Sequence, residues 1–289
     1  MTHGIKFQHG EVRSNKMGFQ HLAQLAHKMV ELSFESVELN FSACSWFDAN
    51  MCAPLGVVLA NSIDKFNTVR LTGLSPGIQS ILSKNQFLAG FGTQPLIDTH
   101  HTTITYRRFN NSDDRLFADY LNQNIRDKGL PKMSVDLGVK FKNSILELFV
   151  NAAMHSESQI GIFSCGQYYP QKHLLDFCVA DGGIGMRRKI FKEIGLKMNS
   201  DQAIAWAMVE GNTTRQGNVP GGLGLKLIRE FITMNNGRIQ IVSDRGFWEF
   251  SAQCENLTRL DTPFPGTVIN IEINTADTKI YRLRSEVKN

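Results

Sequence analysis

Three short segments decide how this chain is interpreted: Glu147-Leu148-Phe149-Val150-Asn151, Asp181-Gly182-Gly183-Ile184-Gly185-Met186 and Gly221-Gly222-Leu223-Gly224-Leu225. All three lie between Ile145 and Leu225. Each is ordinary when taken alone, because glycine-rich turns and polar helix faces are common in proteins. Their order and their spacing along one chain make them informative.

The first segment lies in a long predicted helix, residues 135–154. Glu147, Asn151 and His155 are four residues apart, so they share one helix face, while Leu146 and Phe149 point to other sides. A carboxylate, an amide and an imidazole in one row are the groups expected of a polar site. An exposed polar stripe is the simpler interpretation of these three residues alone.

The second segment follows two predicted apolar strands, residues 160–167 and 174–179. A carboxylate at a strand end, followed by glycines, lets the backbone approach a flat ligand closely. The spacing is Asp-x-Gly-x-Gly from Asp181 to Gly185, which differs from the fingerprint of dinucleotide-binding turns. Taken alone, the segment also fits an ordinary turn.

The third segment opens a helix predicted to continue to about Asn235. It follows a polar stretch, residues 210–220, which we interpret as a lid between two helices. Glycines at a helix start leave N–H groups free at the positive end of the helix dipole, which suits phosphate. Two strands, residues 238–243 and 246–253, are predicted to turn at Asp244-Arg245-Gly246, and an alternating strand over 266–273 completes the sheet.

The first 95 residues predict a smaller α/β unit. Helical spacing over residues 19–32 and 54–66 alternates with strand patterns over 37–41 and 68–72, and Ser75-Pro76 opens a further helix. Residues 35–92 resemble the STAS domains of anti-sigma-factor antagonists, on Phe47-Asp48, Pro54–Leu59 and Leu74–Leu82. That family carries its phospho-serine where this chain has Ala49-Asn50-Met51-Cys52-Ala53. A partner-docking or structural role is therefore expected instead of a phosphorylation switch.

Composition narrows the class of protein. The chain has 289 residues, 42% hydrophobic and 20% charged, which suits two modest globular domains. Its net charge of +4 is scattered, so no nucleic-acid partner is expected. Five widely spaced cysteines favour neither zinc nor a disulfide framework. No signal peptide and no run of 18 apolar residues is present, so we expect a cytoplasmic protein that does not enter a membrane.

Taken together, the three segments and Gly266-Thr267 at the last strand resemble the GHKL ATP-binding domain of gyrase, Hsp90, histidine kinases and MutL. The resemblance is closest to stand-alone anti-sigma-factor serine kinases. It implies an α+β chain, with a C-terminal Bergerat-type α/β sandwich that has helices on one face of a mixed sheet. The expected domains are a STAS-like unit over 1–95, a linker over 96–114 and the ATP-binding domain over 115–289. Within the linker, one strand is expected over residues 102–106.

The resemblance also implies roles for individual residues, with ATP and Mg²⁺ as cofactors. Asp181 would accept a hydrogen bond from the adenine amino group, and Gly183 and Gly185 would let the nucleoside lie against the backbone. Asn151 would be a Mg²⁺ ligand, and Glu147 would orient or deprotonate the attacking water or hydroxyl.

Four further residues complete the expected site. Gly222 and Gly224 would offer N–H groups to the phosphates, and Thr267 would reach adenine through water. Arg215 is a candidate for the γ-phosphate, with a solvated lid charge as the alternative. His155 either contacts phosphate or packs against the sheet.

Two functions remain open on the sequence. The first is an enzyme that hydrolyses ATP or transfers its γ-phosphate to a protein partner. The second is a non-catalytic switch, in which ATP controls docking of a partner by the STAS-like unit. No two-helix segment with a phospho-accepting histidine precedes residue 115, so a sensor histidine kinase is not expected. A homodimer is left open, and the identity of the phospho-acceptor is not encoded in these motifs.

Overall fold

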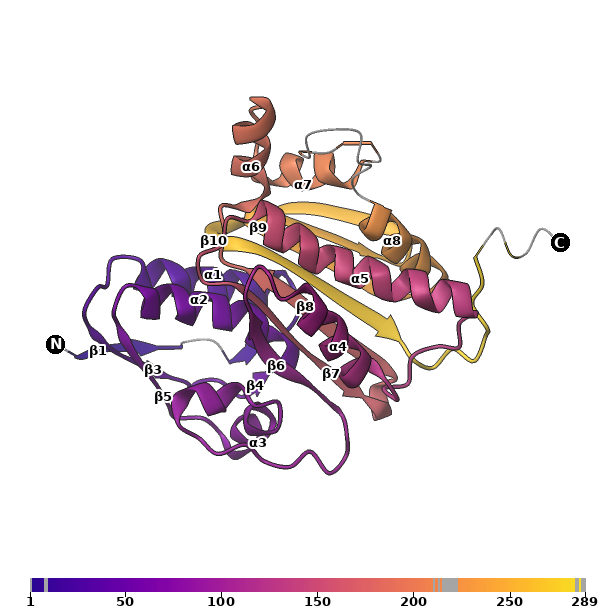
Figure 1. The fold of residues 1–289 in the computed structure, drawn as a ribbon. Helices are drawn as coiled ribbons and strands as arrows, with labels where there is room; N and C mark the ends of the chain where they lie inside the picture. The colour runs from indigo at the N-terminus through magenta and orange to yellow at the C-terminus, as the bar shows by residue number, and fades with distance from the viewer. Residues whose placement is uncertain are drawn as a thin grey trace.

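The computed structural model describes residues 2–7, 10–209, 211–212, 214, 223–283 and 286. It is a mixed α+β fold with a two-stranded, a three-stranded and a five-stranded sheet in the described chain. Figure 1 shows the larger sheet crossing the molecule, with helices on both sides of it. Within the described ranges, every helix is too short or too polar to cross a bilayer.

The five-stranded sheet carries the second half of the chain. Its order is β6-β7-β8-β10-β9, and every neighbouring pair is antiparallel. The prediction of a mixed sheet was therefore wrong. The strands are β6 (Thr103–Phe109), β7 (Ile162–Tyr169), β8 (Leu174–Asp181), β9 (Arg238–Ser251) and β10 (Cys254–Asn274).

Strand β6 comes from the segment predicted to be a linker, residues 96–114. It pairs with β7 from Thr103 to Phe109 and forms one edge of the sheet. Its inward-facing Ile104 and Phe109 are fully buried. The second structural unit thus begins with β6, before the predicted boundary at residue 115.

The predicted hairpin turn at residues 244–246 is absent, because β9 runs through it without a break. Asp244 has a positive φ of 53° but is held in the strand by Arg187 and Ser200, each 2.8 Å from its carboxylate. A Cβ on Gly246 would lie 2.6 Å from the Ser200 carbonyl oxygen, so this glycine serves close packing. The chain turns instead at Ala252 and Gln253, whose φ values of 48° and 64° suit a two-residue hairpin turn.

One face of the sheet is covered by helices α4 (Asp114–Ile125), α5 (Val135–His155) and α8 (Leu223–Asn235). The core between them is rich in aromatic side chains. Phe117 stacks on Phe149 with ring centroids 4.4 Å apart, and Phe109 meets Phe149 edge-on at 5.7 Å. Burying such large rings stabilises the helix layer and fixes α5 against the strands.

The opposite face is covered by the N-terminal unit, whose helices pack against the large sheet. This unit has a parallel sheet β1-β3-β5 of Thr2–Lys6, Ser36–Asn40 and Thr68–Thr72. Its helices are α1 (Lys16–Met29), α2 (Cys52–Asp64) and α3 (Pro76–Lys84), with short helices η1 (Ala49–Met51) and η2 (Phe87–Phe91). Strand β1 and the short pair β2 (Glu11–Val12) and β4 (Trp46–Phe47) were not predicted.

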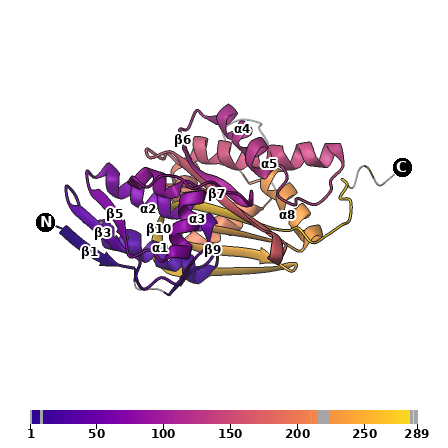
Figure 2. The ribbon, with the colours of Figure 1, turned by 90° about the horizontal axis from the view of Figure 1, so that it is seen from below.

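One core joins the two units. Leu22, Phe19 and Leu55 of α1 and α2 pack in the same buried cluster as Phe163 and Val268 of the large sheet. Figure 2 shows β1 and α8 at opposite ends of the molecule, with the strands of the large sheet between them. The N-terminal unit is therefore attached to the large sheet through a buried interface.

Two helices, α6 (Gly185–Ile194) and α7 (Ser200–Met208), follow β8. In Figure 1 α6 projects from the end of the sheet, and α7 lies beside it. Helix α6 was not predicted, because the glycine-rich segment before it was interpreted only as a turn. Helix α7 begins at Ser200, and Asn199 and Gln202 form a reciprocal capping box before it.

Candidate nucleotide site

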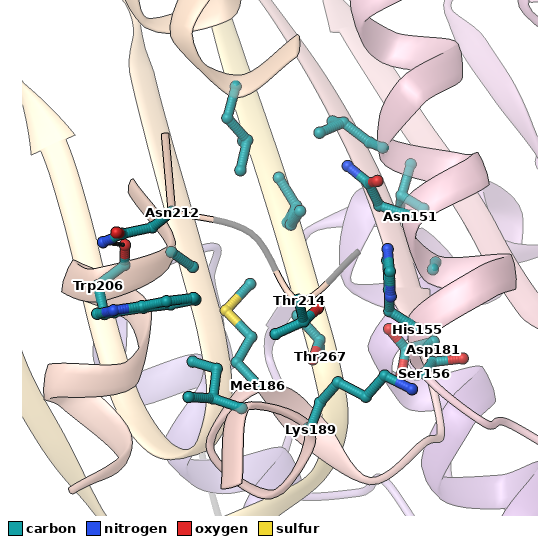
Figure 3. A pocket seen from close by; sticks show the side chains of 18 residues that line it. Asn151, His155, Ser156, Asp181, Met186, Lys189, Trp206, Asn212, Thr214 and Thr267 are labelled. Carbon is teal, nitrogen blue, oxygen red and sulfur yellow. Dashed lines mark hydrogen bonds between the residues drawn. The ribbon is translucent and has the colours of Figure 1, made fainter. Parts of the chain in front are cut away.

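A pocket lies between α5 on one side and α6 with α7 on the other, above strands β8 and β10. It contains about 970 Å³ of space between protein atoms, part of it open to solvent. Figure 3 shows Asn151, His155 and Asp181 on one side of the pocket and Trp206 with Asn212 on the other.

Asp181 lies in the floor of the pocket as the last residue of β8. Only 4% of its surface is exposed, and its Oδ1 accepts a hydrogen bond of 2.9 Å from the Gly183 N–H. Burial raises the pKa of Asp181 to about 7, although hydrogen bonds from the Gly183 and Thr267 backbones oppose this shift. Its carboxyl group can therefore change charge near neutral pH.

Gly183 joins the Asp181 turn to the end of α5. A Cβ at this position would lie 1.9 Å from the Ser156 carbonyl oxygen, a distance that no side chain tolerates. The Ile184 N–H donates to the same oxygen over 2.8 Å. The glycine thus permits a contact that holds Asp181 beside the α5 residues, which are far earlier in the chain.

Thr267 lies directly opposite Asp181 in the register of β10 and β8. Its hydroxyl oxygen is 3.1 Å from that of Ser243, and Ser243 also accepts a hydrogen bond of 2.8 Å from the Met186 N–H. This chain of contacts fixes the start of α6, where Gly185 has a φ of 76°. Asp181, Gly185 and Thr267 consequently line one cavity.

Helix α5 supplies the opposite wall. Asn151 and His155, four residues apart as predicted, both line the pocket, together with Leu148 and Ala152. Glu147 is half-buried one turn earlier on the same helix and is not among the residues that line the cavity. Asn151 and Asp181 therefore share a cavity, whereas the proposed base lies beside it.

Arg215 and Gly222 lie outside the described residues. Gly224 is the second residue of α8, and Leu225, which follows it, lines the pocket. The start of α8 therefore borders the cavity, as we predicted for the helix that the glycine-rich third segment opens.

Sequence reasoning missed the wall formed by α6 and α7. Met186, Lys189, Ile190, Trp206 and Ala207 line the pocket from these helices. For Lys189 a sequence signal existed, since it lies one helical turn after Gly185. Trp206 has no comparable signal, because only the packing of α7 brings it to the pocket.

Lys189 is the one lysine or arginine among the described residues of the pocket wall. Its ammonium group lies 2.8 Å from Glu193 and 3.2 Å from Glu157. The hydrogen bond to Glu193 is the largest cause that raises the pKa of Lys189, so this side chain stays charged. Its charge is already balanced by two carboxylates.

Among the described residues, no group of three or more His, Cys, Asp or Glu side chains could hold a metal ion. The pocket instead offers single oxygen ligands, such as the amide of Asn151, which suits an ion that keeps most of its water. No protein-family model matches the chain, and no curated protein is significantly similar to it in sequence.

Proposed function

We propose that the pocket binds ATP with Mg²⁺ and that the chain is a regulatory ATP-binding protein of the GHKL type. One observation carries the proposal: a buried carboxyl, Asp181, faces the same apolar cavity as Asn151. The antiparallel sheet, with α4, α5 and α8 on one face, supports a Bergerat-type architecture for this half.

Base selection is assigned to Asp181. An ionised carboxylate accepts hydrogen bonds only, so it pairs with the amino group of adenine and opposes the carbonyl oxygen that guanine has there. Thr267 lies next to Asp181 and has a hydroxyl group to offer the same edge of the base. Preference for ATP over GTP follows.

Most of the positive charge that offsets the ATP phosphates must come from outside the described residues of the pocket wall. Lys189 is already paired with Glu157 and Glu193. Asn151 would hold Mg²⁺, which supplies positive charge to the phosphates when bound. Arg215, in the segment outside the described residues, is proposed to add a second positive charge. Gly222 and Gly224 are proposed to add backbone N–H groups near the start of α8.

Turnover is assigned to Glu147. In hydrolysis, its carboxylate would accept the proton of a water whose oxygen bonds to the γ-phosphorus as the bond to the β-phosphate oxygen breaks. In phosphotransfer, a hydroxyl of a protein partner would replace the water. Glu147 lies one turn before Asn151 on α5, so the two residues share one face of the helix.

A binding switch is the second candidate, and the position of Glu147 beside the cavity favours it. In that case ATP binding alone would control a protein partner. In the STAS-like unit, a docking or structural role was expected for residues 49–53. The structure excludes docking at this segment. Ala49, Asn50, Met51, Cys52 and Ala53 are all buried, so this segment presents no surface to a partner.

The test incubates the protein with γ-labelled ATP and Mg²⁺ and measures both bound nucleotide and released or transferred phosphate. Glu147→Ala should keep ATP binding and lose γ-phosphate turnover by at least about tenfold. Its control is Glu230→Ala, an exposed glutamate on α8. Tight binding without turnover in the unchanged protein would select the switch, and absence of ATP binding would overturn both candidates.

Asn151→Ala should weaken binding of Mg·ATP and leave binding of metal-free ATP little changed. Asn143→Ala is its matched control, because Asn143 is exposed two turns earlier on the same helix. Unaltered affinity of Asn151→Ala for Mg·ATP would remove this residue from metal binding.

A further inference from the structure

Trp206 is the one Phe, Tyr or Trp side chain among the described residues that line the pocket. It lies near the end of α7 and is partly exposed, so the indole has ring surface that the protein does not cover. In Figure 3 the indole extends from α7 into the pocket toward Met186, facing the side where Asn151 and His155 lie. A flat aromatic surface is thus directed into an otherwise aliphatic and polar cavity.

The position of α7 is firmly fixed. Ala203 and Ile204 are fully buried, and the Ser200 hydroxyl donates a hydrogen bond of 2.8 Å to Asp244 in β9. At the end of the helix, the Trp206 carbonyl accepts hydrogen bonds from the Val209 N–H at 3.2 Å and the Asn212 side-chain amide at 2.9 Å. The indole is consequently presented by a rigid wall, as affinity for a planar ligand requires.

The chemistry of this wall selects one part of the ligand. Met186, Ile190, Trp206 and Ala207 offer apolar atoms to the pocket. A triphosphate needs charge and hydrogen-bond donors, whereas a base and its ribose gain from apolar and stacking contact. The wall formed by α6 and α7 therefore offers apolar and aromatic contact, while Asn151 and His155 on α5 offer polar groups.

We propose that Trp206 is the packing surface for the nucleoside half of the bound nucleotide, so that it sets affinity for adenosine and not for the phosphates. This inference rests on the proposed function, because it concerns the same pocket. Asp181 would fix the edge of the base and Trp206 its face. Stacking on Trp206 depends on the orientation of the plane of the base. A hydrogen bond to the buried carboxylate of Asp181 alone would not fix that orientation.

The chain contains three tryptophans, so the contact can be followed by fluorescence. Trp46 is partly exposed in the N-terminal unit, and Trp248 is buried with 1% exposure. Trp46→Phe removes the exposed background signal. In this variant, saturating Mg·ATP should change the remaining tryptophan emission. The change should disappear in the double variant that carries both Trp46→Phe and Trp206→Phe.

Affinity is measured separately by equilibrium dialysis with labelled ATP, with adenosine and with inorganic tripolyphosphate. Trp206→Ala should weaken the binding of ATP and the binding of adenosine by a similar factor, about tenfold. This is the loss expected for one base stacked on an aromatic ring. Tripolyphosphate binding should stay unchanged. Trp206→Phe should recover most of the affinity, and Trp46→Ala, the same substitution outside the pocket, should have no effect.

The inference is overturned if Trp206→Ala binds ATP as tightly as the unchanged protein, or if the loss is equal for tripolyphosphate. It is also overturned if dialysis shows saturation with ATP while the Trp206 emission stays constant. Failure of the proposed function looks different, because the unchanged protein would then retain no ATP in dialysis. A urea unfolding curve for each variant separates loss of binding from loss of fold.

Discussion

The side-chain amide of Asn50 donates a hydrogen bond of 2.8 Å to Oδ1 of Asn270, a residue 220 positions later in the chain. Both side chains are almost completely buried. Asn270 in turn donates to Gln240 over 3.1 Å, and Gln240 donates to the Ser14 carbonyl over 3.0 Å. Hydrogen-bonded amides thus join the N-terminal unit to β10 and β9 inside a buried interface.

Truncating one member of this network should destabilise the whole protein. Asn270→Ala leaves the Asn50 amide and the Gln240 carbonyl oxygen buried without this partner, which costs about 1–3 kcal/mol per group. The free energy of unfolding from urea titrations is the measurement, with the exposed Asn143→Ala as control. A loss below about 0.5 kcal/mol would show that the network does not hold the units together.

Asp176 should make stability depend on pH. It is buried in the same interface, its Oδ1 has no described hydrogen-bond partner, and burial raises its pKa well above the usual value, with Glu272 and Asp48 adding to the shift. A folded-state pKa above the unfolded value of about 3.9 means that the folded state binds the proton more tightly. Stability contributed by this proton is complete below pH 4 and declines as pH rises toward the folded-state pKa.

Asp176→Asn should therefore be more stable than the unchanged protein at pH 8, and the difference should shrink as pH falls to 5. The slope for one group is at most about 1.4 kcal/mol per pH unit. Urea unfolding at pH 5, 6.5 and 8 measures it. Asp119→Asn, an exposed carboxylate on α4, should show no such trend, and a pH-independent difference for Asp176→Asn would contradict the assignment.

Asp181 should make nucleotide affinity rise with pH, whereas the stability contributed by the Asp176 proton falls as pH rises. Its pKa of about 7 means that only a small fraction of the protein carries the carboxylate at pH 6. Because the proposed hydrogen bond from the adenine amino group needs that carboxylate, apparent affinity for ATP should fall about tenfold between pH 8 and pH 6. Asp181→Ala should bind weakly at both values, and a flat profile in the unchanged protein would exclude this role.

Gly183→Ala should disrupt the site and the fold together. The added Cβ meets the Ser156 carbonyl at 1.9 Å, so either α5 or the Asp181 turn has to move. We expect a loss of more than about 2 kcal/mol in stability, in the range of overpacked cores, with loss of ATP binding. Gly138→Ala in α5 has open space for its Cβ and should stabilise by about 0.5–1 kcal/mol. Equal stability of the two variants would refute the close contact.

Local sequence signals predicted several elements well. Strand β5 has the predicted bounds, Thr68–Thr72, because turn residues flank a short apolar run. Ser75 caps α3 as predicted, accepting the Ile78 N–H over 3.4 Å, and Asn236 ends α8 with a φ of 55°. The prediction for α5 holds to within one residue at its C-terminal end. Such features depend on neighbours within a few residues, so the sequence alone contains their cause.

Long-range packing decided the rest. Asp244 and Gly246 are typical turn residues, yet contacts with α6 and α7 keep them inside β9. A strand was expected within the predicted linker, but only the structure shows that β6 pairs with β7 and belongs to the large sheet. Trp206 and Lys189 reach the pocket only because α6 and α7 pack against β9 and β10.

By itself the sequence determined which residues could form a site: Asn151, Asp181 and the glycines between strand and helix, whose spacing sets their helix face and strand end. The tertiary structure alone decided that they share one cavity, that a tryptophan forms its far wall, and that the N-terminal unit covers the other sheet face. The reason is physical. Helix and turn preferences act over a few bonds, whereas the pairing of strands and the burial of side chains join residues more than a hundred positions apart.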